Sequence, residues 1–178
     1  MSVRIATRDD REEIFRLLQM LHEENGIYSM DEGAVYEMMD RAFDRKGGII
    51  GVIGGAGDIQ GVIFLLISRH WYTRDNHLEE LLNFVRPDCR RSAHAKTLIE
   101  FAKSCAKEIG IPLVIGVITN KRVVEKVRLY RRSLGWPSGA FFVFNGRWIN
   151  EQSPDDEFWR EPFPPRRANG GKELALKD

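Results

Sequence analysis

The segment from Val85 to Leu98 holds the residues whose types and spacing best suit the binding of an anion. It reads V-R-P-D-C-R-R-S-A-H-A-K-T-L, and Pro87 ends the preceding strand because proline has no N–H to donate to a sheet. We expect a helix to begin at about Ser92, so residues 90–95 present backbone N–H groups beside two arginines. Unpaired N–H groups and the positive end of a helix dipole favour phosphate. An ordinary capped helix whose first turn lacks bulk is the alternative interpretation.

The same segment resembles the acetyl-coenzyme A signature of the GNAT (GCN5-related N-acetyltransferase) family. Arg90, Ala93 and Ala95 stand where that signature has Gln or Arg, then Gly, then Gly or Ala. An alanine thus replaces the first glycine. Alanine has less backbone freedom than glycine and keeps a ligand farther from the backbone, which predicts a shifted loop position on the pyrophosphate or a weaker affinity for the coenzyme. A second match is residues 129–136, L-Y-R-R-S-L-G-W, which resembles the family's helix ending L-Y-E-K-L-G-F. The resemblance covers residues 3–144.

The resemblance implies two catalytic residues. Tyr130 matches the tyrosine of the second motif, which lies near the coenzyme sulfur and can protonate the leaving thiolate; a buried structural tyrosine is the alternative. Glu79 precedes the phosphate loop, where several family members carry a glutamate that deprotonates the amine, usually through water. Strand alternation predicts Glu79, Asn83 and Val85 on one face of the strand and Glu80 on the other, unless a bulge intervenes. Two solvated glutamates at a strand end are the alternative.

The resemblance also implies the coenzyme contacts. The backbone around Asn83 to Val85 should pair with the pantetheine amides, as an added strand pairs with an open sheet edge. The expected coenzyme-binding residues are Asn83, Phe84, Val85, Arg90, Arg91, Ser92, Ala93, His94, Ala95 and Asn120. Asn120 lies about one helical turn farther from Tyr130 than the family's asparagine usually does.

Basic residues crowd the helix that carries Tyr130, and they are Lys121, Arg122, Lys126, Arg128, Arg131 and Arg132. A solvated helix face is one interpretation of this pattern. Contact with the coenzyme's 3′-phosphate, or with an anionic acceptor such as RNA, is the other.

Hydrophobic periodicity predicts the elements that must position these residues. We expect strands at 3–6, 49–53, 59–68, 77–85 and 113–118, the last of them buried on both faces, and a closing hairpin at 140–149. We expect a first helix that begins at a capping box formed by Asp9 and Glu12 and is closed by Gly26. A second helix carries the apolar stripe from Ala34 to Phe43 and is ended by Gly47-Gly48, and two more cover residues 92–109 and 123–134. The glycine cluster at 54–57 joins two strands and predicts a hairpin turn, not a nucleotide-binding loop.

The order of these elements predicts a mixed α/β fold with an antiparallel first half. The parallel pair is the crossover from strand 77–85 through helix 92–109 to strand 113–118. The resemblance implies a GNAT-like central mixed sheet, flanked by helices, in which these two strands splay apart to admit the pantetheine arm.

The composition is that of an ordinary globular domain, and its small net charge does not favour nucleic acid or a membrane surface as a partner. The chain has 178 residues, 43% of them hydrophobic and 30% charged, with a net charge of +1. We expect an acetyltransferase domain at 1–150 and an irregular Pro/Gly-rich tail at 151–178. There is no signal-peptide pattern and no apolar run of the roughly 20 residues that a membrane span needs. The two cysteines have neither metal-type nor redox-motif spacing, and the histidines are too few for a metal site, so we expect no bound metal. A reducing cytoplasm is the expected compartment.

The resemblance implies an N-acetyltransferase that passes an acetyl group from acetyl-CoA directly to a primary amine within a ternary complex, and the composition favours a cytoplasmic location. A small amine, a protein N-terminus or lysine, and an amine on aminoacyl-tRNA all remain open as acceptors, and so does a homodimer. Neither a membrane nor nucleic acid in general is an expected partner. A non-catalytic module that binds acyl-CoA without turnover is the alternative from another class.

Overall fold

The structure is a computed structural model, and it describes residues 2–25, 28–117, 119 and 122–139. The predicted hairpin at 140–149, the tail at 151–178 and Asn120 lie outside the described residues. The elements are β1 (Arg4–Ile5), α1 (Arg11–Asn25), α2 (Glu32–Phe43), β2 (Gly48–Gly55), β3 (Asp58–Ser68), β4 (His77–Val85), α3 (His94–Ile109), β5 (Leu113–Ile115) and α4 (Val123–Leu134), with single-turn 3-10 helices at Arg8–Asp10 and Pro87–Cys89.

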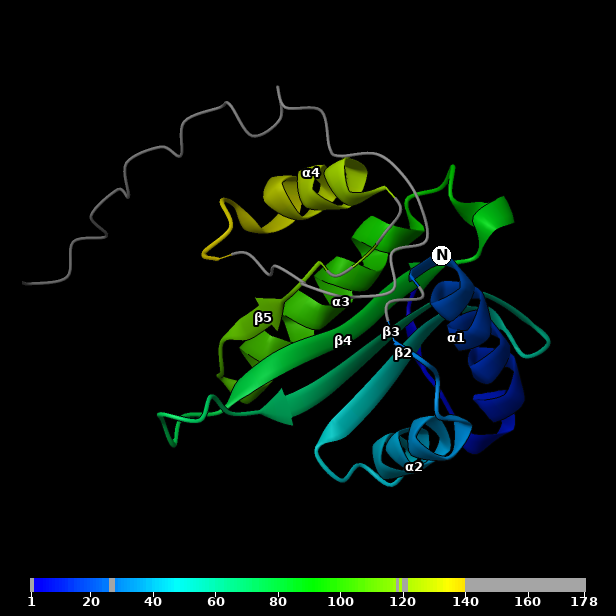
Figure 1. The fold of residues 1–178 in the computed structure, drawn as a ribbon, viewed down its shortest axis with the longest axis horizontal. Coiled ribbons are helices and arrows are strands. Elements are labelled where there is room, and N and C mark those ends of the chain that lie inside the picture. The colour runs from blue at the N-terminus through cyan, green and yellow to red at the C-terminus, as the bar shows by residue number, and fades with distance from the viewer. Residues whose placement is uncertain (1, 26–27, 118, 120–121, 140–178) are drawn as a thin grey trace, which may run out of the picture.

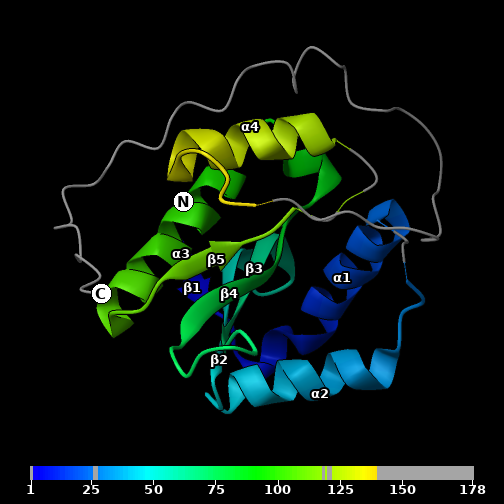
Figure 2. The same ribbon diagram turned by 60° about the vertical axis from the view of Figure 1, so that its left-hand side comes forward.

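One sheet with the strand order β1-β2-β3-β4-β5 organises the described part of the chain. The strands from β1 to β4 pair antiparallel, whereas β4 and β5 pair parallel, so the predicted fold class is confirmed. Helices α1 and α2 cover one face of the sheet and α3 covers the other, with α4 near α3 (Figures 1 and 2). The predicted crossover from β4 through α3 to β5 is therefore the parallel element.

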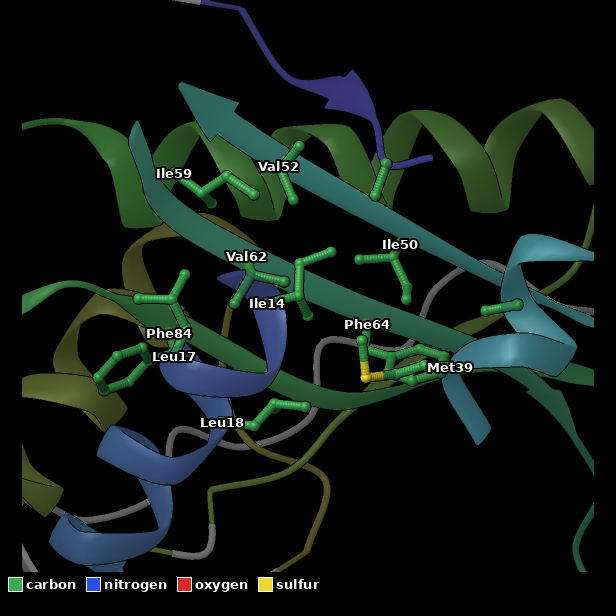
Figure 3. Packing of buried hydrophobic residues seen from close by; sticks show 12 residues of the cluster. Ile14, Leu17, Leu18, Met39, Ile50, Val52, Ile59, Val62, Phe64 and Phe84 are labelled. Atoms are coloured by element: carbon green, nitrogen blue, oxygen red, sulfur yellow. The ribbon is translucent and has the colours of Figure 1, made fainter. Parts of the chain in front are cut away.

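Two apolar clusters hold the helices on the sheet. The cluster under α1 and α2 is shown in Figure 3, where Ile14 and Leu17 of α1 and Met39 of α2 lie against strand residues such as Val62 and Phe84. The predicted helical stripes supply these side chains, and Met39 is core filler as expected. Each fully buried aliphatic side chain contributes roughly 1.5–3 kcal/mol. A second cluster under α3 includes Leu98 and Ala102 on the helix.

The N-terminal capping box lies earlier in the chain than predicted. Asp10, and not Glu12, reaches back to its cap: its carboxylate accepts from the backbone N–H of Thr7 at 2.8 Å. The same carboxylate binds both terminal nitrogens of Arg4 at 2.7 Å, which lowers the pKa of Asp10 through this hydrogen-bonded pair. The ion pair with Arg4 therefore holds Asp10 in the capping box of Thr7 and fastens the start of the helical segment to β1.

The predicted stop of α3 is confirmed, because Gly110 takes a left-handed conformation with φ of 71° and its N–H caps the helix. The glycine-rich segment between β2 and β3 is a hairpin turn, as predicted. Strand β5 differs from the prediction: it has three residues, Leu113–Ile115, and all are half-buried. Its apolar sequence indicated a strand buried on both faces, but pairing with β4 stops at Ile115, so the two strands stay together only briefly.

Candidate active site

A β-bulge in β4 determines which acidic side chain enters the site. Phe64 of β3 pairs with Leu82, while Leu65 pairs with Glu80, so Leu81 is an extra residue with no partner across the ladder. The bulge reverses the alternation, because one inserted residue moves all that follow to the opposite face. Glu80 therefore shares a face with Asn83. The prediction that Glu79 lies on the face of Asn83 and Val85 is wrong, for this reason.

Glu80 and Tyr130 form the central pair of the site. Tyr130 on α4 donates its hydroxyl to the carboxylate of Glu80, at 3.1 Å from each oxygen. Glu80 is only 8% exposed. Burial raises its pKa to about 7, against the opposing effects of the Tyr130 hydrogen bond and the charge of Lys126. Burial and the adjacent carboxylate also raise the pKa of Tyr130, so its hydroxyl keeps its proton at neutral pH.

A cavity of about 290 Å³ opens beside this pair. It lies where β5 leaves β4, because β5 pairs with residues 78–80 of β4 and with none beyond them. The lining residues are Leu21, Asn25, Glu79, Glu80, Leu81, Leu82, Asn83, Val114, Gly116, Val117, Lys126 and Tyr130. The separation of β4 and β5 thus creates a hollow that is apolar for the most part and has two carboxylates, an amine and a phenol at its wall.

Lys126 reaches the cavity wall one helical turn before Tyr130, so this member of the basic run does not lie on a solvated face. Its Nζ donates to Oγ1 of Thr119 at 3.0 Å, and that hydroxyl donates to Oδ1 of Asn25 at 2.6 Å. Burial lowers the pKa of Lys126. This chain of hydrogen bonds joins α4 to the end of α1 across the cavity.

Arg90, the arginine of the predicted phosphate loop, is held in place from three sides. Its Nη2 lies 2.5 Å from a carboxylate oxygen of Glu24 on α1, and its Nε donates to the carbonyl of Val85 at 3.0 Å. Its guanidinium also lies over the ring of Phe84, 5.3 Å from the ring centroid. The loop is therefore tied to α1 by an ion pair in which both side chains are largely shielded from water.

The rest of the predicted phosphate loop leads into α3, which begins at His94, two residues later than expected. Ser92 donates to the carbonyl of Cys89 at 2.6 Å and accepts the N–H of His94 at 3.2 Å. His94 contacts the side chain of Gln60 at 2.9 Å. Arg91, Ser92 and Ala93 are exposed, and the cap residue Ala93 has no side chain that could occupy the first N–H groups of the helix. Ala95 packs against the apolar cluster under α3.

Asn83 and Glu79 line the cavity in different ways. The amide nitrogen of Asn83 lies 3.5 Å from the carbonyl of Ala95, while its buried Oδ1 has no hydrogen-bond partner among the described residues. Glu79 keeps 41% of its side chain exposed and lies 4.0 Å from Nε2 of His77. The structure therefore places Glu79 at the open side of the cavity and Glu80 at its buried side.

Sequence reasoning placed Tyr130, Glu79 and Asn83 in one neighbourhood, and all three line the cavity. It preferred Glu79 as the base, left Glu80 and water open for that role, and gave no role to Glu24, Asn25 or Thr119. Glu24 had no recognisable signal, because a glutamate near a helix end is ordinary in sequence. The proline and the basic turn after β4 did predict where the strand would end, and β4 ends there.

Two further observations concern the described residues as a whole. They contain no group of three or more His, Cys, Asp or Glu side chains placed to hold a metal ion. None of their helices combines the length and the apolar character that crossing a membrane requires.

No protein-family model matches the sequence, and no curated protein sequence matches it. Solved structures do match. The aminoglycoside antibiotic 6′-N-acetyltransferase of Acinetobacter haemolyticus superposes with a TM-score of 0.62 at 18% identity, over 84% of this chain and 100% of that one. A predicted acetyltransferase of Clostridium acetobutylicum, solved with acetyl-CoA, gives a TM-score of 0.66 at 12% identity, over 81% and 95%.

A further match is AAC(6′)-Iy in complex with the bisubstrate analogue CoA-S-monomethyl-acetylneamine. Its TM-score is 0.64 at 14% identity, over 82% of this chain and 97% of that one. At these identities the likeness establishes the fold. The chain has the GNAT fold, as its two sequence motifs predicted.

Proposed function

We propose that the protein is an N-acetyltransferase that uses acetyl-CoA as co-substrate and acetylates a primary amine by direct transfer. The observation that carries this proposal is the Glu80–Tyr130 pair at the point where β4 and β5 part. Amide formation from a thioester needs one group that accepts a proton from the amine and another that gives a proton to the departing thiolate. The pair offers both groups, next to a cavity, in a fold whose neighbours include structures with acetyl-CoA and with a bisubstrate analogue.

The acid–base properties of the pair suit neutral pH. With a pKa of about 7, Glu80 is ionised in a substantial fraction of molecules and can accept the proton that the amine loses. Tyr130 keeps its proton because its pKa is raised, so it can protonate the sulfur as the C–S bond breaks. Two hydrogen-bonded groups titrate as a pair, so a pH–rate profile reports the pair and not one residue.

Glu79 is the second candidate for the general base. It lines the same cavity, as the sequence analysis expected, and its exposure allows it to act through water. We favour Glu80, because burial brings its pKa close to the operating range and its carboxylate contacts Tyr130. Glu79→Gln and Glu80→Gln form a matched pair of variants that separates these two roles.

The open part of β4 supports the expected coenzyme position. Residues 81–85 extend past the last pair with β5, and an extended ligand can add to such an edge. Asn83 presents a buried Oδ1 that lacks a donor among the described residues, which suits an amide N–H of the pantetheine arm. The exposed turn at residues 91–93 and the start of α3 would then face the pyrophosphate, with Arg90 beside them.

A small-molecule amine is the acceptor class that we favour. Glu79 and the ionised fraction of Glu80 place negative charge at the cavity wall, against Lys126 as the single lysine among the described lining residues, and this charge attracts an ammonium group before it loses its proton. Two of the structural neighbours are named as aminoglycoside acetyltransferases, which act on small amines. A peptide amine and an RNA-linked amine remain as alternatives. The two cysteines are free thiols, and we keep the expectation of a reducing cytoplasm.

The test is to incubate the protein with acetyl-CoA and a panel of amines, and to follow the release of free coenzyme thiol. The panel contains an aminoglycoside, a diamine, a peptide with a free N-terminus and an aminoacyl-tRNA. Amine-dependent thiol release that falls in Glu80→Gln supports the proposal. Binding of acetyl-CoA without thiol release with any amine would favour the non-catalytic acyl-CoA-binding module instead.

A further inference from the structure

The proposed mechanism leaves one reactive group of the cavity without a task. Lys126 lines the cavity together with Glu80 and Tyr130, and its Nζ is held by Oγ1 of Thr119 at 3.0 Å. Lys126 and Tyr130 are four residues apart on α4, so their side chains occupy the same face of the helix one turn apart. A lysine amine therefore lies beside the tyrosine that would stand at the thioester sulfur.

The surroundings of Lys126 favour its reactive form. A lysine acts as a nucleophile only when it is neutral, and burial lowers the pKa of Lys126. The charged groups around it oppose one another: Glu24 on α1 and Glu80 on β4 raise this pKa, while Arg90 and Arg122 lower it. The amine is thus neutral in a larger fraction of molecules than an exposed lysine of the same chain.

We infer that Lys126 is an internal acetyl acceptor, so that the protein acetylates its own Lys126 when acetyl-CoA is bound and no external amine occupies the cavity. The inference rests on the proposed function, because it requires the thioester to lie next to Tyr130. The substrate of this second activity is the side chain of the enzyme itself.

The chemistry balances with the groups already present. The electron pair of neutral Nζ forms the N–C bond to the acetyl carbonyl carbon, and the C–S bond breaks. Glu80 takes the proton that the nitrogen loses, and Tyr130 gives a proton to the thiolate. The products are N-acetylated Lys126 and free coenzyme thiol. Because an amide is far less reactive than a thioester, the acetyl group stays on Lys126.

Acetylation of Lys126 would act back on the site. The positive charge of Lys126 lowers the pKa of Glu80, and the acetyl group removes that charge. The pKa of Glu80 then rises, so a smaller fraction of the base is ionised at neutral pH. We expect the modified protein to turn over external amines more slowly at neutral pH, with its pH–rate midpoint displaced upward.

The experiment is to incubate the full chain with acetyl-CoA in the absence of any amine, and to map acetylated peptides by mass over time. Lys103 is the internal control, because it lies on α3, is more exposed and is ion-paired to Glu100. We expect Lys126 to gain its acetyl group roughly tenfold faster than Lys103, because the folded protein positions Lys126 next to the thioester. In urea this positioning is lost, and the two acetylation rates should become equal. Tyr130→Phe should slow acetylation of Lys126 and leave that of Lys103 unchanged.

A second readout, chemical labelling, does not depend on acetyl transfer from acetyl-CoA. Trace labelling with acetic anhydride should modify Lys126 ahead of Lys103, and added coenzyme A should protect Lys126 alone. Amine-dependent thiol release with an unmodified Lys126 would overturn the inference and leave the proposed function standing. If there is neither thiol release with any amine nor protection by coenzyme A, the proposed function is contradicted, and the inference is contradicted as well.

Discussion

Two regions of the molecule, the core under α1 and α2 and the cavity where β4 and β5 part, bury different kinds of side chain. Under α1 and α2, Ile14, Met39 and Val52 are fully enclosed by other apolar groups. At the cavity, next to the bulge in β4, Glu80 is buried almost as deeply, against Tyr130 and near Lys126. The first region stabilises the fold through burial, whereas the second costs stability because charged groups leave water.

This difference teaches where function resides in the molecule. Burial that yields only apolar contact needs no explanation beyond folding. Buried ionisable groups with displaced pKa values, arranged around a cavity, point to a site that uses them. Variants in the two regions should therefore have opposite effects: cavity variants should change turnover, and core variants should change stability.

The largest effect is expected from Glu80→Gln. Loss of the general base should lower kcat/KM by about 10²–10⁴-fold, as is usual for such groups, while Glu79→Gln should change it far less. Steady-state rates with the best amine of the panel give this comparison. An equal or larger loss in Glu79→Gln would transfer the role of base to Glu79.

The same variant also tests the stability side of the comparison. The pKa of Glu80 is raised from 4.5 to about 7, so between these values the folded state holds a proton that the unfolded chain has released. The contribution of Glu80 is therefore full below pH 4.5 and is lost as the pH rises through about 7. Relative to Glu80→Gln, the wild type should lose Tm between a pH of about 5 and a pH of about 8. A constant difference in Tm over this range would contradict the raised pKa.

The core counterpart is Ile14→Ala, which leaves a cavity in the fully buried cluster under α1. We expect the free energy of unfolding to fall by about 2–5 kcal/mol, measured by denaturant titration, with turnover per folded molecule retained. Ile109→Ala is the matched control, because Ile109 is 48% exposed at the end of α3, and its cost should stay within about 0.5 kcal/mol. A comparable loss in both variants would mean that the two positions are buried alike.

Tyr130→Phe removes the proton donor and keeps the ring. Turnover should drop by roughly 10–10³-fold, in kcat more than in KM, because the lost interaction exists chiefly in the transition state. The thermal shift with acetyl-CoA should hold, and Tm should fall only slightly, because Glu80 loses a hydrogen bond worth about 1 kcal/mol. A structural tyrosine would behave in the opposite way, with full turnover in a destabilised protein.

The role of Arg90 is tested by reversing the charges of its ion pair with Glu24. Arg90→Glu sets two carboxylates against each other, so stability should fall by about 1–3 kcal/mol, between the values for exposed and buried pairs, and the acetyl-CoA thermal shift should disappear. The double variant with Glu24→Arg restores the pair in reverse. Its Tm should recover while the acetyl-CoA shift stays absent. A recovered shift would limit Arg90 to a structural role.

The smallest effect is expected from Glu13→Gln. The carboxylate of Glu13 accepts the backbone N–H groups of Gly57 at 3.0 Å and Ile59 at 2.5 Å, and so fastens α1 to the turn between β2 and β3. Weaker acceptance by the neutral amide should cost about 1 kcal/mol in thermal or chemical unfolding. Turnover should be unaffected, since the turn lies away from the cavity. A change in kcat would connect this turn to the site.

Sequence patterns predicted most of the fold, because hydrophobic period and glycine positions are local properties. The helical stripes of α1 and α2 and the stop of α3 at Gly110 followed from them. Strand β5 was predicted too long, because an apolar run does not indicate over how many residues the strand pairs with its neighbour. The capping box was predicted at Asp9 because Arg4, which binds Asp10, lies outside the local pattern.

The sequence by itself determined the GNAT fold, the position of the turn after β4 and the tyrosine of α4, because these depend on short motifs. Only the tertiary structure decided that Glu80 contacts Tyr130. The bulge at Leu81 moves Glu80 to the face of β4 that carries Asn83, and no pattern in the sequence indicates this bulge. It also decided that Arg90 pairs with Glu24 and that Lys126 lines a cavity. These contacts join residues far apart in the chain, and their energies depend on a burial that no single segment encodes.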